Sequence, residues 1–208
     1  MSIYDGADQA IREMNRRNLK SFNRLKLAKW DEINLVRAVS QVYDESSRLA
    51  RQKYYEIAAE AFIVAAYQAK VEPRRAAELA DDIITVAWVM GILDRVDPVT
   101  LYAFTSETER KKERLIEALS AAQNRNYEID KALRYWTAQV AQYATTTVDE
   151  AVIAAFRAAG VEKVVWHTAQ DEKVCEDCEP LDGREFSINK IPVKPHWGCR
   201  CELEPVLS

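Results

Sequence analysis

Apolar side chains recur every three to five residues along most of the first 160 positions, which is the spacing of one face of an α-helix. Five stretches follow this pattern: 5–28, 33–70, 74–93, 107–119 and 127–159. Pro73 and Pro98 stand at breaks between them, since proline is favoured in a first helical turn and disfavoured inside a helix. The pattern therefore predicts long helices joined by short connections.

The two longest apolar stripes run from Ile33 to Val64 and from Ile129 to Phe156. Two extended amphipathic helices bury their apolar faces most readily against each other, so we expect these two to pack together in a bundle. Gly160 follows the last stripe and is typical of the position just beyond a helix C-terminus.

After Gly160 the pattern changes to that of short strands. Residues 164–168 are β-branched and aromatic, 181–184 form a turn sequence, and 199–206 alternate apolar with charged side chains. We therefore predict a mainly α protein with two domains. Residues 1–160 form a long-helix bundle, and residues 161–208 form a small α+β zinc-binding module with a short antiparallel sheet.

The composition and charge of the chain exclude some classes of function. The chain has 208 residues, 48% of them hydrophobic and 30% charged, which favours a globular fold. A net charge of -4 gives no overall attraction to nucleic acid or anionic lipid. The first residues lack the features of a signal peptide and no apolar run reaches the length of a membrane span, so we expect a cytoplasmic protein with reduced thiols.

The four cysteines lie close together near the C-terminus, within a pattern typical of zinc sites. Cys175-x2-Cys178 is followed by seventeen residues and then His196-x2-Cys199-x-Cys201. Each half supplies a pair of ligands, and two such pairs complete a tetrahedron around zinc. Five candidates compete for four positions. We favour Cys175, Cys178, His196 and Cys199, with Cys201 either replacing one of them or adjoining the site.

Other chemistry fits these residues less well. A redox dithiol normally begins a helix that lowers its thiol pKa, whereas Cys178 precedes a turn sequence. A catalytic zinc needs an open position and a general base, and His167, the only other histidine, is followed by Thr-Ala instead of a glutamate at the required spacing. We expect His167 to be a strand residue and the protein not to be an enzyme.

Charge is distributed unevenly along the chain. Residues 162–208 contain ten acidic and six basic side chains, so the zinc module is not expected to bind DNA. Between Arg12 and Lys29 there are seven basic residues and one acidic residue. Four of the basic residues recur every four positions along one side of a helix: Arg12, Arg16, Lys20 and Arg24. This stripe is either a solvated face or a contact with DNA or an acidic protein surface.

The C-terminal half of the chain resembles the phage minor head proteins of the Mu F-like head morphogenesis family. The resemblance is carried by Val165-Trp166, Asp171, Cys175-x2-Cys178, Leu181-Asp182-Gly183, Phe186, Pro195-His196, Cys199-Arg200-Cys201 and Pro205. Three upstream stretches are also similar to such proteins: Asp97–Thr100, Glu109–Lys112 and Glu128–Leu133.

The resemblance implies a low-copy structural protein of a phage or prophage head, made in the bacterial host cytoplasm. It implies portal and major capsid proteins as partners, a role at the portal vertex in head assembly, and participation in DNA packaging or delivery, with packaged DNA a candidate partner of the basic stripe. It implies no membrane, no small-molecule substrate and no catalytic residue, and we expect no enzyme domain after Ser208. The zinc cluster it implies is Cys175, Cys178, His196, Cys199 and Cys201. The alternative is a zinc-containing nucleic-acid-binding protein.

Overall fold

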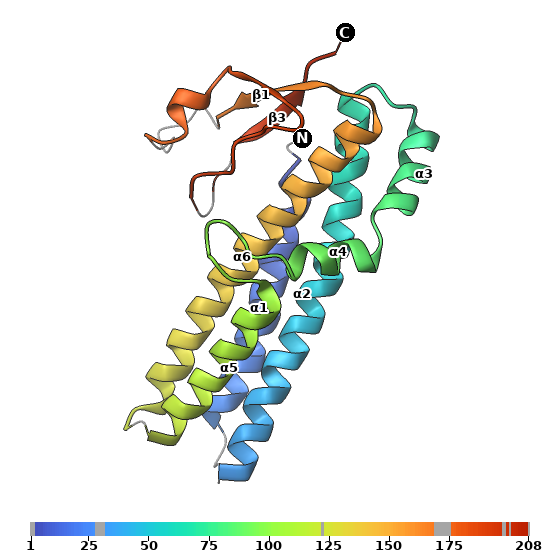
Figure 1. The fold of residues 1–208 in the computed structure, drawn as a ribbon. Helices are drawn as coiled ribbons and strands as arrows, with labels where there is room; N and C mark the ends of the chain where they lie inside the picture. The colour runs from blue at the N-terminus through green and yellow to red at the C-terminus, as the bar shows by residue number, and fades with distance from the viewer. Residues whose placement is uncertain are drawn as a thin grey trace.

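The computed structural model describes residues 3–27, 32–121, 123–168, 176–196, 199 and 201–207. Its helices are α1 (Asp5–Leu27), α2 (Glu32–Gln68), α3 (Pro73–Ile83), α4 (Val86–Leu93), α5 (Phe104–Ala121) and α6 (Arg125–Ala158). Figure 1 shows α1, α2, α5 and α6 running side by side as an elongated bundle, with α3 and α4 beside α2. The mainly helical fold predicted from the sequence is confirmed.

A small sheet lies across one end of the bundle, and the N-terminus lies at the same end (Figure 1). It consists of β1 (Lys163–His167), β2 (Glu185–Ser187) and β3 (Glu202–Pro205) in the order β2-β1-β3. Both pairings are antiparallel, and Val164 lies opposite Phe186 on one side and Pro205 on the other. The central strand β1 therefore joins the two segments that contain the cysteines.

Local hydrogen bonds explain where α6 begins and ends. The side chain of Asn124 accepts a hydrogen bond of 3.2 Å from the amide of Tyr127, which caps the first turn. At the other end Gly160 has a φ of +75°, and the amide of Val161 donates to the carbonyl of Phe156 at 2.9 Å. Glycine adopts this left-handed conformation without steric cost, so Gly160 ends the helix as the sequence predicts.

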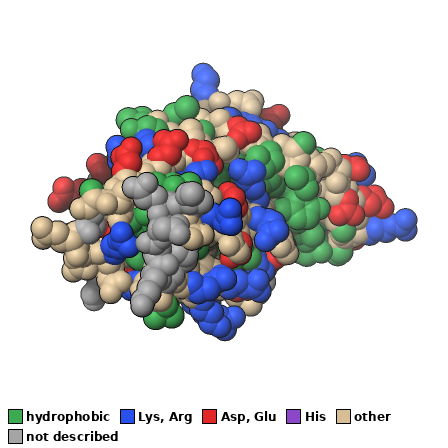
Figure 2. Space-filling model, turned by 90° about the horizontal axis from the view of Figure 1, so that it is seen from below, with side chains coloured by type: hydrophobic (Ala, Val, Ile, Leu, Met, Phe, Trp, Pro, Cys, Tyr) green, Lys and Arg blue, Asp and Glu red, His purple; other side chains and the backbone are tan. Residues whose placement is uncertain are grey.

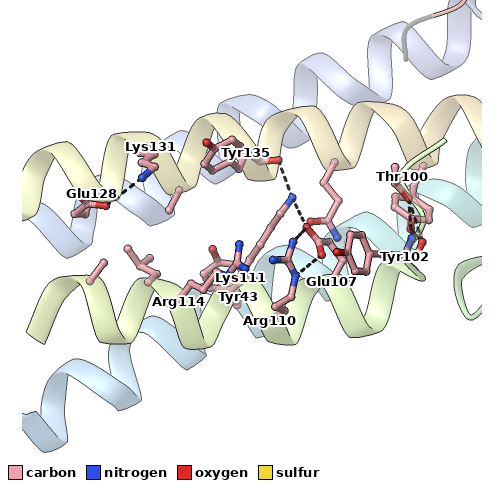
Figure 3. A pocket seen from close by; sticks show the side chains of 15 residues that line it. Tyr43, Thr100, Tyr102, Glu107, Arg110, Lys111, Arg114, Glu128, Lys131 and Tyr135 are labelled. Carbon is pink, nitrogen blue, oxygen red and sulfur yellow. Dashed lines mark hydrogen bonds and ion pairs between the residues drawn. The ribbon is translucent and has the colours of Figure 1, made fainter. Parts of the chain in front are cut away.

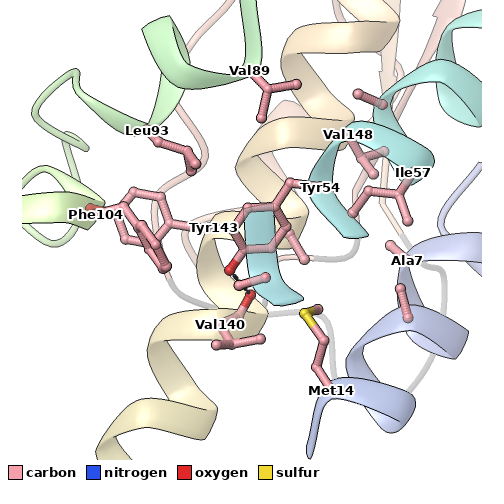
Figure 4. Close-up of a cluster of buried hydrophobic side chains, with 14 of the residues drawn as sticks. Ala7, Met14, Tyr54, Ile57, Val89, Leu93, Phe104, Val140, Tyr143 and Val148 are labelled. Carbon is pink, nitrogen blue, oxygen red and sulfur yellow. Dashed lines mark hydrogen bonds between the residues drawn. The ribbon is translucent and has the colours of Figure 1, made fainter. Parts of the chain in front are cut away.

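The core of the bundle is apolar and rich in aromatic rings. The expected packing of the two longest helices is confirmed, because α2 and α6 make the most extensive contact between any two elements. Trp136 of α6 packs edge-on against Tyr43 of α2, with ring centroids 5.4 Å apart. The hydroxyl of Tyr54 is paired although it is buried, since it donates to the carbonyl of Val140 at 3.0 Å (Figure 4). This core holds the long helices together without help from the C-terminal cysteines.

Two expectations about the helices are corrected. The predicted helix 74–93 is two helices, because the chain turns at Ile84 and the Thr85 hydroxyl accepts a hydrogen bond of 3.1 Å from the amide of Trp88 to cap α4. The sequence from Glu107 to Leu119 is highly charged and predicts a solvated helix with apolar anchors, but its first residue is buried. Glu107 is only 7% exposed and makes ion pairs with Arg110 and Lys111. Strand β2 was not predicted, since three residues are too few to show a pattern.

Candidate metal centre

The first half of the candidate site is Cys178, which begins a tight turn that is hydrogen-bonded to the central strand β1. Its carbonyl accepts a hydrogen bond of 3.0 Å from Leu181, at the end of a short 3-10 helix (Glu179–Leu181). Gly183 then takes a φ of +69°, and its amide donates to the carbonyl of Trp166 in β1 at 2.8 Å. The turn predicted at 181–184 thus connects Cys178 to the sheet by backbone hydrogen bonds.

A side-chain interaction reinforces the same connection. The carboxylate of Asp182 accepts hydrogen bonds from the amide and the hydroxyl of Thr168, at 2.8 and 3.1 Å. These bonds, first of all the one from the amide, stabilise the charged form and lower the pKa of Asp182. The turn therefore stays attached to the end of β1 at neutral pH.

The second half of the site approaches from the other side of β1. Cys199 precedes β3, whose Leu203 lies opposite Trp166. Trp166 packs in one buried cluster with three cysteines, Cys178, Cys199 and Cys201, each 5% exposed or less. His196 is partly exposed. Cys178 and Cys199 are 21 residues apart in the sequence, and pairing of both flanking segments with β1 brings them together.

The distances between these side chains match a tetrahedral metal site. The Sγ atoms of Cys178 and Cys199 are 3.7 Å apart, and Cys178 Sγ is 3.5 Å from Nε2 of His196. Ligands at usual zinc bond lengths stand about 3.8 Å apart for two sulfurs and about 3.6 Å for sulfur and nitrogen at tetrahedral angles. The ligand atoms of Cys178, His196 and Cys199 all lie within 4.8 Å of one another. These three residues can hold a metal ion.

The remaining two candidates are placed differently. Cys175 lies outside the described residues. Cys201 is buried beside the site. Among the described residues, the group that could hold a metal ion consists of Cys178, His196 and Cys199 and does not include Cys201. Which residue supplies a fourth ligand therefore stays a prediction.

Burial and a nearby lysine act on Cys199 in opposite directions. Burial raises the pKa of the Cys199 thiol, because the thiolate would lose its hydration, and the charge of Lys194 partly opposes this effect. Metal ligation requires the thiolate. A bound divalent cation would supply the positive charge that stabilises it.

Three residues behind the site, which sequence reasoning missed, link it to the bundle. Lys194 forms an ion pair of 2.9 Å with Asp149 of α6, and its ammonium donates a hydrogen bond of 2.6 Å to the hydroxyl of Tyr4. That hydroxyl donates to Asp149 and lies 3.3 Å from the carbonyl of Cys201. Residues from the two ends of the chain thus meet on α6. No spacing in the sequence signals this, because Tyr4 and Asp149 are 145 residues apart.

His167 does not contribute to the group of three. It lies in β1, as expected, and its Nε2 is 2.8 Å from a carboxylate oxygen of Glu204 in β3. Its contact is thus with the neighbouring strand.

The four basic residues of the stripe on α1, Arg12, Arg16, Lys20 and Arg24, are all exposed, but they are not equivalent. Arg24 forms an ion pair of 3.1 Å with Glu45 of α2. Arg12, Arg16 and Lys20 form no ion pair with any residue that the structure describes. Figure 2 views the bundle from the end remote from the sheet, where lysine and arginine gather in the middle and lower part of the face and acidic groups lie mostly towards its upper and right margins. On this face, basic side chains therefore form one concentrated area.

Comparison with known proteins gives one match. Residues 107–204 match the family model described as phage Mu protein F like protein, a range that includes all five candidate ligands. No curated protein and no solved structure matches the chain. Within the described part of the chain, no helix combines the length and the apolar character that crossing a membrane requires.

Proposed function

Since residues 107–204 form a domain of the phage Mu protein F-like family, we propose that the protein is a minor structural component of a phage or prophage head. It acts at the portal vertex in head assembly and in the packaging or delivery of DNA, with portal and major capsid proteins as partners. The family match carries this proposal, because it covers α5, α6 and the module with the candidate ligands.

Mass spectrometry of purified heads tests the role. The protein should be present in low copy and should co-purify with portal protein when the two are expressed together. Heads of normal composition that lack the protein would contradict the proposal. Detection of the chain only in the soluble fraction of the lysate, after heads have been removed, would contradict it as well.

The metal in this proposal is zinc, with a structural role. Sulfur and nitrogen ligands in a nearly buried tetrahedral arrangement are typical of closed structural sites. Cys178, His196 and Cys199 supply three ligands, Cys175 supplies the fourth, and Cys201 packs beside them. We propose no catalytic role for any of these residues.

Cobalt substitution decides between the two candidates for the fourth ligand. The visible spectrum of bound Co²⁺ reports tetrahedral geometry and the number of thiolate ligands. Cys175→Ser should lose the three-thiolate spectrum, whereas Cys201→Ser should retain it. The reverse result would make Cys201 the ligand. Equal retention in both variants would show that either cysteine can supply the fourth ligand and would contradict its assignment to Cys175 alone.

The exposed, unpaired residues Arg12, Arg16 and Lys20 favour a second element of function, which is contact between α1 and an anionic partner. That partner is packaged DNA or an acidic surface of a head protein. Replacing all three with Gln removes the charge while changing helix propensity little, so the fold should survive and the association should weaken. The matched control replaces three exposed arginines elsewhere on the bundle: Arg37, Arg48 and Arg134. Equal effects of both variants on DNA binding and head incorporation would identify the stripe as a solvated face.

A further inference from the structure

A cavity of about 530 Å³ opens between α5 and α6, away from the candidate metal centre. Figure 3 shows that α5 contributes Glu107, Arg110, Lys111 and Arg114, and that α6 contributes Lys131 and Tyr135 on the facing wall. This volume is within the range of ligand-binding pockets.

The walls of the cavity carry more positive than negative charge. Four basic and two acidic side chains line it. Glu107 is shared by Arg110 and Lys111, at 2.7 and 3.3 Å. Arg114 has no ion pair with any described residue, and Lys131 approaches Glu128 only at 4.0 Å. Two cations therefore remain available to an anionic group inside the cavity.

Two buried polar atoms of the lining also lack partners. The hydroxyl of Tyr43 and the side-chain carbonyl oxygen of Gln139 make no hydrogen bond within the described residues, although both residues are only 1% exposed. Burial raises the pKa of Tyr43, so its hydroxyl keeps its proton and donates. Both atoms have almost no accessible surface, so neither faces the open cavity, and the charged side chains of the walls are the groups that a ligand would meet.

The α4–α5 loop exposes an apolar side chain between two residues that line the cavity. Leu101 is 71% exposed and stands between Thr100 and Tyr102, which both line the cavity. Its φ is +61°, a conformation that is unfavourable for leucine. Asp97, buried at 4%, fixes this loop by accepting hydrogen bonds from the amides of Val99 and Thr100 at 2.9 and 2.7 Å. The loop therefore holds a strained, exposed leucine in a fixed position.

We propose that this cavity, together with Leu101, binds a short segment of a partner protein that carries acidic and apolar residues. Arg114 and Lys131 bind its carboxylates, and Leu101 covers an apolar side chain. Tyrosine and arginine, which are enriched in the lining, are also the residues that dominate protein interfaces. A DNA duplex is too wide to enter a cavity of about 530 Å³.

Selection from a displayed library of short random peptides on the full-length protein tests the charge requirement. The enriched peptides should combine Asp or Glu with apolar residues. Replacing Arg114 and Lys131 with Gln should lower the affinity of the protein for a selected peptide by about tenfold, as expected for two partly exposed ion pairs. The control replaces Arg74 and Arg75, which are exposed on α3, with Gln and should leave affinity unchanged. Enrichment without acidic residues, equal loss in both variants, or displacement of the peptide by duplex DNA would overturn the proposal.

A second pair of variants tests the role of Leu101. Asn accepts the left-handed conformation, so Leu101→Asn should leave the melting temperature unchanged or raise it while weakening the selected peptide. Lys70 has a φ of +62° away from the cavity, so Lys70→Asn should relieve the same strain and leave the affinity unchanged. If Leu101→Asn binds the peptide as tightly as the parent protein, the apolar part of the proposed contact is wrong.

Discussion

Trp136, Phe104 and Tyr43 of the helical bundle are exposed by 1% or less, whereas in the C-terminal module the side chains most buried around the sheet include three cysteines. The bundle buries large apolar surfaces contributed by long helices. The module has strands of three to five residues, and the helices of the bundle are much longer. The cysteine cluster of the module is thus held differently from the bundle, whereas Val164 and Ile188 of the module join the apolar core of the bundle.

This difference is a physical reason to expect a metal in the module and not in the bundle. A unit of about 50 residues rarely stabilises itself by apolar burial alone and usually requires a metal, disulfides or another partner. The module has the ligands for a metal in Cys178, His196 and Cys199, and it has a polar contact with the bundle through Lys194. We therefore expect the module to respond to loss of metal and the bundle to respond to loss of packing.

The largest effect should follow from Cys178→Ser. Bound zinc should fall from about one ion per chain to almost none, because a structural site rarely tolerates the loss of a ligand. Hydrogen exchange should then accelerate in β1, β2 and β3 while α2 and α6 stay protected. His167→Ala is the control, because the side chain of His167 contacts Glu204. This variant should retain the metal. Equal loss of protection in α2 and α6 would show that the bundle depends on the metal as much as the C-terminal module does.

The reciprocal change is Trp136→Ala in the bundle. Removing this fully buried ring should lower the free energy of unfolding by about 3–5 kcal/mol, since large-to-small core substitutions leave a cavity. Urea unfolding followed by circular dichroism measures the change. Tyr127→Ala removes an aromatic ring that is 55% exposed on the same helix and should have little effect. Similar losses in both variants would mean that the aromatic core does not determine the stability of the bundle.

A smaller effect is expected where the two regions meet. Lys194→Met keeps the apolar stem but leaves Asp149 without its cation, so stability should fall by about 1–3 kcal/mol. Hydrogen exchange should increase both near Tyr4 and in β3. The ammonium of Lys194 donates to the hydroxyl of Tyr4 and to the carbonyl of Cys199, which precedes β3. Lys190→Met, at an exposed lysine of the same segment, is the control. An increase confined to the module would show that this contact does not couple it to the bundle.

The smallest effect concerns the pH dependence of the bundle. The pKa of Glu13 is lowered from 4.5, first by its hydrogen bond to Lys53 of α2. A carboxyl whose pKa is lower in the folded state adds stability above its unfolded pKa, and this is lost as the pH falls through its folded pKa. Glu13→Gln should therefore reduce stability slightly at pH 7 and flatten its decline below about pH 4.5. Glu117 is exposed and forms no ion pair with a described residue. Glu117→Gln should therefore change neither the stability at pH 7 nor its decline at low pH.

Much of the fold could be predicted because helix periodicity and turn chemistry are local. The stripes from Ile33 to Val64 and from Ile129 to Phe156 predicted the two central helices, and Gly160 marked the end of the second. The spacing of Cys178, His196 and Cys199 likewise predicted candidates for one site, since short intervals between ligands limit how the chain can arrange them.

Only the tertiary structure decided the features that depend on distant parts of the chain. The burial of Glu107 between Arg110 and Lys111 became visible only when α5 was packed in the bundle. Cys199 and Cys201 have the same alternation in the sequence, and only the folded chain brings Cys199, and not Cys201, into the group of three. The contact of Lys194 with Tyr4 joins residues 190 positions apart, and its contact with Asp149 joins the module to α6, so no local pattern of hydrophobic and polar residues can encode them.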